Sequence, residues 1–408
     1  MKITKVRLRR LEGKIPTPPI EREERLRRPT DIYPHFKAQR RDSFSTTPEK
    51  TRDGKYKVSR IFVQIETDEG VTGVAGPVAA LGPNAPAFYI DTAIRPLLIG
   101  QDPLATEYLC DIMYRSNTAG RKGDYMRAVS MIDLALWDLK GKWVGKPVVK
   151  LLGGLTKEKI PAYISALGYS LELYKARAKV REIKRQGYSA MKWFFTEGPQ
   201  DGAEGIMKNI ELMEALRETA GPEMKIMIDA WKSWDVPYTL KMEELLGEFD
   251  PYWFEEPVIP DFIESYAELR AASTVLIAGG EQEYTRWGFQ LLMDMKAMDI
   301  YQPEPVACGG ISEALKICNM ASARDVPAIL HCGSLPANLQ ISFAQSPAVI
   351  PMMEYLILSQ LGETQFFFKN EIKPVKGYFY PPTIPGLYEL DEKKIEDEHD
   401  IGWRQVEV

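Results

Sequence analysis

The sequence predicts an α/β protein in which a closed barrel of parallel strands follows a smaller α+β region. After residue 155, eight short apolar segments alternate with amphipathic segments. Strict alternation of strands and helices implies that the strands are parallel. Eight such units in about 200 residues imply that the sheet closes into a barrel. The length of 408 residues, 45% of them hydrophobic, accommodates this barrel and one smaller domain.

The N-terminal region has the pattern of extended strands. Residues 2–10 (KITKVRLRR) and 59–70 (SRIFVQIETDEG) alternate in polarity, and the second segment ends in a turn at Asp68-Glu69-Gly70. Between them, residues 16–57 form a long polar stretch, and loops of that length are usually functional or disordered. Helical spacing then predicts a helix over 125–144, which ends at Gly145-Lys146-Pro147.

The barrel strands are expected wherever an apolar segment precedes a helical one. They are predicted at 160–165, 190–195, 225–231, 252–257, 275–281, 298–304, 327–333 and 350–356. The short extended pieces after residue 375 are expected to pack on the N-terminal region. We therefore predict a capping domain over 1–128 together with 375–408, and a barrel domain over 129–374.

Composition excludes several classes of function. The formal net charge is −5, with 52 basic and 57 acidic residues well mixed, which argues against a nucleic-acid partner. No apolar stretch approaches the ~20 residues that span a bilayer, and the N-terminus lacks the apolar centre of a signal peptide. The four cysteines lack disulfide or metal-site spacing, so a cytoplasmic protein with reduced thiols is expected.

Three acidic residues lie at equal spacing near the ends of consecutive strands. Asp229 and Glu255 are 26 residues apart, as are Glu255 and Glu281. The carboxyl ends of barrel strands meet at one rim, so these carboxylates should converge. Three carboxylates in one pocket repel each other unless a cation is bound, and oxygen ligands suit Mg²⁺. A single acidic residue at a strand end is more often a helix cap, but three at matching offsets favour a metal site.

A histidine near the end of the seventh predicted strand is the candidate base. Only three histidines occur in the chain, and His331 follows Glu304 by 27 residues, one strand–helix unit later. Glu304 could accept the Nδ1 proton of the imidazole, which would make Nε2 the better base. A lone histidine at such a position is as often structural, but its place opposite the acidic triad favours catalysis.

These motifs resemble the enolase superfamily and its mandelate racemase subgroup. IMID at Asp229, WFE at Glu255 and GGE at Glu281 are similar to the metal ligands of that superfamily, and residues 129–154 resemble its junction between cap and barrel. The CGG at 308–310 and the DAWKSWDVPY segment resemble L-rhamnonate dehydratase and related acid-sugar dehydratases. The resemblance implies a (β/α)₇β barrel, a capping domain from both termini, Mg²⁺ and a small acid-sugar substrate.

The resemblance also implies roles for other residues. Glu354 matches an acidic residue that binds or protonates, and Lys192 would supply a cation for the substrate carboxylate or the enediolate. The usual partner of the histidine in this subgroup is Asp, whereas here it is Glu304. Racemases of the subgroup carry a second lysine where Phe194 stands, so the sequence favours dehydration, giving a 2-keto-3-deoxy acid.

Candidate substrate contacts are less specific. Arg41 lies in RRDSF, which resembles an RxSF segment of rhamnonate dehydratases. His35 is a weaker candidate, because the histidine of those enzymes lies elsewhere. Trp193 and Trp231 could form an apolar wall of the site, although tryptophans at a barrel rim are as often packing residues.

Two other functions stay open at this point. An epimerase or racemase would need a second base on the Lys192 side, which the sequence does not show. A non-catalytic paralogue should have lost the ligands or the base, and here all are present. The chain is expected to form a homo-oligomer, whose size no sequence pattern specifies.

Overall fold

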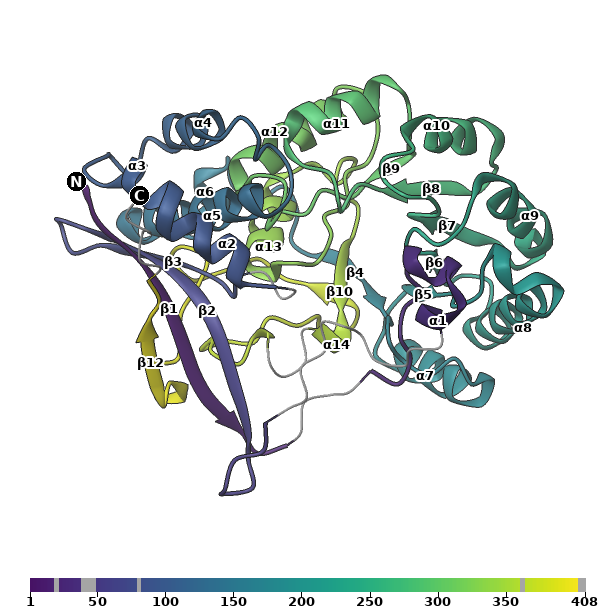
Figure 1. The fold of residues 1–408 in the computed structure, drawn as a ribbon. Helices are drawn as coiled ribbons and strands as arrows, with labels where there is room; N and C mark the ends of the chain where they lie inside the picture. The colour runs from purple at the N-terminus through teal and green to yellow at the C-terminus, as the bar shows by residue number, and fades with distance from the viewer. Residues whose placement is uncertain (18–21, 38–48, 79–81, 360–363, 403–408) are drawn as a thin grey trace.

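The structure is a computed structural model that describes residues 1–17, 22–37, 49–78, 82–359 and 364–402. Figure 1 shows two parts, a cap that holds both chain termini and a barrel of strands surrounded by helices. Within these residues no helix is long and apolar enough to cross a membrane.

The cap is built on a four-stranded antiparallel sheet in the order β12-β1-β2-β3. Its strands are β1 (Ile3–Ile15), β2 (Tyr56–Thr67), β3 (Thr72–Ala75) and β12 (Asp397–Asp400). The turn predicted at 68–70 connects β2 to β3, and β1 pairs with β2 along its whole length. The C-terminal strand β12 pairs with β1, and the Arg9 guanidinium lies 2.7 Å from the Glu398 carboxylate. The end of the described tail therefore returns to the N-terminal strand through β12.

Helices cover one face of this sheet (Figure 1). They are α2 (Asn84–Tyr89), α3 (Arg95–Leu98), α4 (Thr106–Ser116), α5 (Asp124–Val144) and α6 (Val148–Leu151), while the short α1 (Pro34–Lys37) lies on the barrel side. Helix α5 begins one residue before the predicted start and ends where predicted. Gly145, at φ 70°, ends it in the left-handed conformation that glycine adopts without strain. Most of α5 is buried, because it lies between the cap sheet and the barrel helix α12 (Gly310–Ser322).

The barrel sheet is parallel and runs in the order β10-β4-β5-β6-β7-β8-β9. Its strands are β4 (Ile160–Ser165), β5 (Ala190–Phe194), β6 (Lys225–Asp229), β7 (Pro251–Glu255), β8 (Leu276–Gly279), β9 (Ile300–Tyr301) and β10 (Met353–Leu356). The outer helices are α7 (Leu173–Arg185), α8 (Gly202–Ala220), α9 (Val236–Leu246), α10 (Ile263–Ala272), α11 (Thr285–Asp294), α12 and α13 (Leu335–Ala344), with a short α14 (Ile357–Ser359) after β10. The two-residue strand β11 (Tyr378–Phe379) pairs antiparallel with β4.

The strand predicted over 327–333 is reduced to a single bridge. Ala328 bridges Tyr301 of β9, and the Ile329 amide donates to the Tyr301 carbonyl at 2.8 Å. The His331 amide still donates to the Pro303 carbonyl at 3.2 Å, and the chain then turns, with the Gly333 amide donating to the His331 carbonyl at 3.1 Å. The expected strand is present as a short link between β9 and β10, and its end is a turn.

One apolar layer fills the barrel and shows that eight segments enclose it. The layer takes one inward-facing residue from each segment: Tyr163, Ala190, Met227, Trp253, Ala278, Ile300, Ile329 and Met352. All are buried. The edge-to-face contact of Tyr163 with Trp253, at 5.5 Å between ring centroids, crosses the interior of the barrel. The barrel is therefore a packed core with a floor of apolar side chains below its mouth.

A buried aspartate in α5 ties the cap together. One Asp138 carboxylate oxygen accepts from the amides of Leu387 and Tyr388 at 2.7 and 3.0 Å, and the other accepts from the Val74 amide at 2.7 Å. The Lys142 ammonium lies 2.5 Å from the second oxygen. A single side chain thus joins α5, β3 and the C-terminal tail.

Asp138→Ala should lower the free energy of unfolding by about 3–5 kcal/mol, because it leaves buried donors and the Lys142 charge unpaired. Urea unfolding would measure the change. Asp111→Ala is the matched control, since Asp111 also pairs with a cation four residues later but is half exposed. The control should change stability by less than about 1 kcal/mol, and an equal loss in both variants would contradict the role of Asp138.

Candidate active site

The polar layer above the apolar floor holds most of the candidate site. Because strand side chains alternate, the residue two places after each floor residue also faces inward. These positions are Ser165, Lys192, Asp229, Glu255, Gly280, Gln302, His331 and Glu354. Five of the residues predicted from the sequence therefore lie in one layer at the barrel mouth. Glu281 and Glu304 lie just beyond it.

Lys192 is the central cation of this layer and is completely buried. Its ammonium is hydrogen-bonded to Glu255 and lies 2.9 Å from Glu354 and 3.7 Å from Asp229. Burial lowers the pKa of Lys192, but the carboxylates of Glu255 and Glu354 outweigh it and hold that pKa well above its usual range. In this arrangement Lys192 neutralises carboxylates of the chain itself.

Glu354 is enclosed by its partners. Its side chain is fully buried, one oxygen faces Lys192, and the other accepts from the Cys332 amide at 3.0 Å. Burial raises its pKa, but Lys192 and His331 lower it further, so that the net pKa lies below the usual range for Glu. A carboxylate held in this way is suited to fixing positive charge and poorly suited to donating a proton.

His331 lies between two carboxylates. Its Nδ1 is 2.5 Å from Glu304 and its Nε2 is 2.8 Å from Glu281. Glu304 thus reaches Nδ1 although its side chain is one methylene group longer than that of the usual Asp. Burial lowers the pKa of His331, but Glu281 and Glu354 outweigh it and raise that pKa well above its usual range.

Two further charged residues at the mouth were not predicted as catalytic or ligand residues. The Lys232 ammonium lies 2.5 Å from Glu256 and 3.0 Å from Glu281, and all three side chains are buried. Burial, followed by the charge of Glu281, raises the pKa of Glu256 to about 8. The sequence signal that could have indicated a supporting role for Glu256 is its place directly after Glu255. Lys232 could have been suspected only from its place three residues after Asp229.

The residues predicted to contact substrate are dispersed. Trp231 is half-buried at the end of β6, with the Lys232 ammonium 4.3 Å from its ring centroid. Trp193 is completely buried and faces away from Lys192, because neighbouring strand residues point to opposite sides. His35 is exposed in α1, and its ring contacts Phe36. Arg41 lies outside the described residues.

The three predicted ligands fit a hard divalent cation. Asp229 and Glu255 are neighbours in the register of β6 and β7, and the loop after β8 brings Glu281 beside them. Burial, followed by the charge of Glu255, raises the pKa of Asp229 to about 7. A full negative charge is therefore costly at Asp229 without an added cation, and all the available donors are oxygens.

The charge balance of the mouth supports the same conclusion. We define the mouth cluster as six buried carboxylates with two lysines and one histidine: Asp229, Glu255, Glu256, Glu281, Glu304, Glu354, Lys192, Lys232 and His331. Six acids exceed three basic groups. Among the described residues, one group of acidic and histidine side chains has possible ligand atoms that all lie within 4.8 Å of one another, and it is not at the mouth. It consists of Glu12, Asp397 and His399 on the cap sheet. There Glu12 pairs with Lys57 at 2.8 Å, and the other two residues are exposed.

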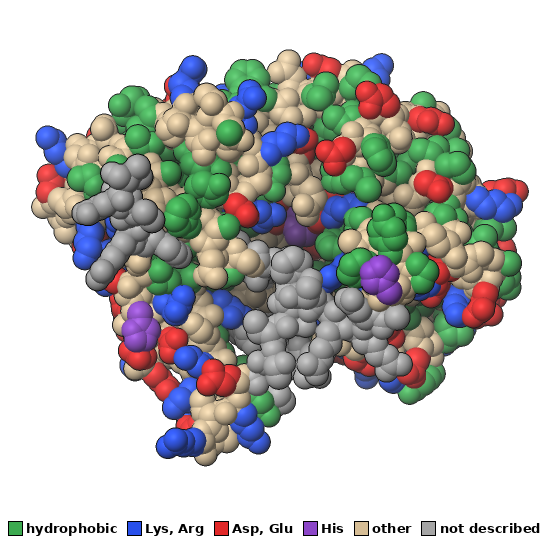
Figure 2. Space-filling view, viewed as in Figure 1, with side chains coloured by type: hydrophobic (Ala, Val, Ile, Leu, Met, Phe, Trp, Pro, Cys, Tyr) green, Lys and Arg blue, Asp and Glu red, His purple; other side chains and the backbone are tan. Residues whose placement is uncertain are grey.

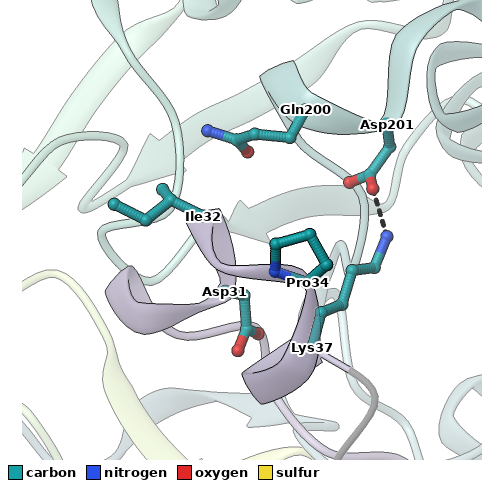
Figure 3. A pocket seen from close by; sticks show the side chains of 6 residues that line it. All are labelled: Asp31, Ile32, Pro34, Lys37, Gln200 and Asp201. Carbon is teal, nitrogen blue, oxygen red and sulfur yellow. Dashed lines mark hydrogen bonds and ion pairs between the residues drawn. The ribbon is translucent and has the colours of Figure 1, made fainter.

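One cavity of the structure shares no residue with the mouth cluster. It has a volume of about 470 Å³ and is lined by Asp31, Ile32, Pro34, Lys37, Gln200 and Asp201 (Figure 3). Lys37 pairs with Asp201 across it, which joins α1 to the loop after β5. The surface is hollowed between cap and barrel, where basic and histidine side chains are visible (Figure 2). The charged groups that line the cavity are paired, Lys37 with Asp201 and Asp31 with Arg25.

Family models match both parts of the chain. The mandelate racemase and muconate lactonizing enzyme N-terminal domain matches residues 44–153, and the enolase C-terminal domain-like family matches 175–394. The crystal structure of rhamnonate dehydratase from Gibberella zeae, complexed with Mg, is 30% identical and has a TM-score of 0.76. That similarity covers 96% of this chain and 95% of the other.

Curated relatives are similar over most of their length. An arabinonate dehydratase of Saccharolobus solfataricus is 34% identical over 80% of this chain and 87% of its own. An L-rhamnonate dehydratase of Saccharopolyspora erythraea is 30% identical over 90% of this chain and 89% of its own. A D-galactarolactone cycloisomerase of Agrobacterium fabrum is 30% identical over 81% of this chain and 88% of its own.

Gly333→Ala should separate Glu304 from His331, because a Cβ at Gly333 would overlap the Glu304 carboxylate. The hydrogen bond that the His331 Nδ1–H donates to Glu304 is one of the contacts that raise the pKa of His331. In metal-free protein this pKa should therefore fall, as an NMR titration of the imidazole nitrogens would measure. Gly247→Ala, where nothing lies within 4 Å of the new Cβ, is the control. An unchanged pKa in the Gly333 variant would show that Glu304 does not support the imidazole.

Proposed function

We propose that this chain, which belongs to the mandelate racemase and muconate lactonizing enzyme family of the enolase superfamily, is a magnesium-dependent acid-sugar dehydratase. The observation that carries the proposal is the position of His331, with Nδ1 held by Glu304 and Nε2 facing the carboxylate cluster. A base oriented in this way beside a cation site suits removal of a hydrogen α to a carboxylate.

The reaction begins at the α-carbon of the substrate. Neutral His331 accepts the α-hydrogen at Nε2 while Glu304 keeps the proton on Nδ1, which leaves an enediolate. Asp229, Glu255 and Glu281 would hold the metal. When bound, Mg²⁺ supplies positive charge that opposes the imidazolium and stabilises the second negative charge of the enediolate.

Loss of the β-hydroxyl completes the reaction. The proton on His331 returns to the leaving oxygen, so that water departs and an enol remains, which becomes a 2-keto-3-deoxy acid. We assign this step to His331 in place of Glu354, because Lys192 and the Cys332 amide occupy both Glu354 oxygens. Lys192 then acts through the carboxylates that it neutralises.

The proposal also covers the substrate contacts, the cellular setting and the oligomeric state. Trp231, half-buried beside Lys232, is the proposed apolar contact for substrate, and Arg41 and His35 are weaker candidates. The proposed partner is a small acid sugar, with no nucleic acid. A reducing, cytoplasmic setting agrees with four buried free cysteines. A homo-oligomer agrees with the exposed apolar stripe Trp287, Leu291 and Met295 on α11 and its C-cap, at 55, 50 and 38% exposure.

Incubation of the protein with Mg²⁺ and a library of aldonic and aldaric acids in D₂O should give a 2-keto-3-deoxy acid from at least one of them. NMR would follow both the product and the recovered substrate. A sample with EDTA should make no product, and added Mg²⁺ should restore it. Epimerisation at C2 without keto acid would favour a racemase, and an isomer formed from a lactone would favour a cycloisomerase.

Phe194, an apolar residue on the Lys192 side, supports the dehydratase over the racemase, since it cannot serve as a second base.

His331→Asn should lower kcat by about 10²-fold or more, because the proton transfer is lost while the carboxylates remain in place. Exchange of the α-hydrogen with D₂O should stop in the same variant. His399→Asn, at an exposed histidine of the cap strand β12, is the matched control. A His331 variant with nearly normal kcat would require another base.

A further inference from the structure

Every carboxylate of the mouth cluster contacts a cation of the chain itself. Lys192 pairs with Asp229, Glu255 and Glu354. The remaining acids pair with the other two basic groups: Lys232 contacts Glu256 and Glu281, and His331 contacts Glu281 and Glu304. Of the three proposed metal ligands, Glu281 alone has a different cation on each oxygen, since Lys232 lies on Oε1 and His331 on Oε2.

The position of Lys232 depends on an unusual backbone. Trp231 and Lys232 have φ values of 42° and 66°, and Glu256 has φ 43°, in the left-handed region that side chains with a Cβ rarely adopt. The Lys232 amide donates to the Glu256 carbonyl at 2.6 Å, which joins the two strained segments. Such conformations cost energy and persist where the surrounding structure requires them.

We propose that Lys232 is a built-in counter-ion of Glu281, a positioning residue that keeps the metal site formed before the metal binds and that competes with the metal for this carboxylate. The inference rests on the proposed metal site and goes beyond it, because it gives Lys232 a function in the metal-free protein.

The expected change in metal affinity on removal of Lys232 follows from the charges at the site. In the metal-free protein Lys232 stabilises both Glu256 and Glu281. A divalent cation at Glu281 repels the nearby ammonium and takes over its role, so Lys232 stabilises the metal-bound protein less. By thermodynamic linkage, removal of Lys232 should destabilise the metal-free protein more than the metal-bound protein, and should therefore tighten metal binding.

The test is Mg²⁺ binding to the full chain by calorimetry, without substrate. Lys232→Met should lower the Kd for Mg²⁺ by about fivefold or more, the lower end of the coupling between linked sites. Lys122→Met is the matched control, because Lys122 pairs at 2.8 Å with Glu283, which is not a proposed ligand. The control should leave Kd unchanged. A Lys232 variant that binds Mg²⁺ as the wild type does, or more weakly, would overturn the inference.

Thermal unfolding separates positioning from a merely structural role. Lys232→Met should lower Tm in EDTA and recover most of the loss in Mg²⁺, whereas a structural role would lower Tm equally in both. If this variant does not fold in either condition, Glu256→Gln provides the opposite test: with Glu281 as its remaining partner, Lys232 should compete more strongly and weaken Mg²⁺ binding. Equal or tighter binding by Glu256→Gln would overturn the inference. Wild-type protein that binds no Mg²⁺ would instead contradict the proposed metal site itself.

Discussion

Compensation of buried negative charge is the constraint on which the barrel mouth depends. Six carboxylates lie in a region with almost no solvent exposure, where an unpaired charge costs several kcal/mol. Lys192, Lys232 and His331 pair with all of them but do not balance their total charge. The remaining excess of negative charge favours the binding of a divalent cation there. Each basic residue that pairs with these carboxylates therefore also affects the proposed metal site. The same groups therefore serve stability and chemistry.

The barrel supplies this arrangement through the alternation of its strands. The apolar floor, with Tyr163 and Trp253 in contact across it, separates the charged layer from the rest of the core. Two residues further along each strand, the inward position becomes polar in most segments. Side chains that are about 26 residues apart in the chain thus become neighbours, because each strand–helix unit returns the chain to the same rim.

Buried polar contacts hold the elements of the cap together and attach the cap to the barrel. Asp138 joins α5 to β3 and to the C-terminal tail. Asp133, one turn earlier in α5, accepts from the Ser312 amide and hydroxyl at 3.0 and 2.6 Å at the start of the barrel helix α12. Helix α5 therefore links the two parts. The segment before α1 also reaches the barrel, where the Arg27 guanidinium donates to the Thr196 carbonyl at 2.9 Å. These contacts connect the cap to the barrel at two places, α12 and the segment after β5.

The sequence by itself determined the α/β class, seven of the eight barrel strands, and the layer that holds Asp229, Glu255, His331 and Glu354. Periodicity and equal spacing carry that information, because both are properties of the chain. Strand alternation could also have excluded Trp193 from the pocket, since it neighbours Lys192. Tertiary structure alone decided that Lys192 and Glu354 pair with each other, that Glu304 reaches His331, and that Lys232 lies on Glu281. These contacts depend on distances between different strands and on left-handed turns at Trp231, Lys232 and Glu256, and pairwise distances across a barrel are not encoded in any local pattern.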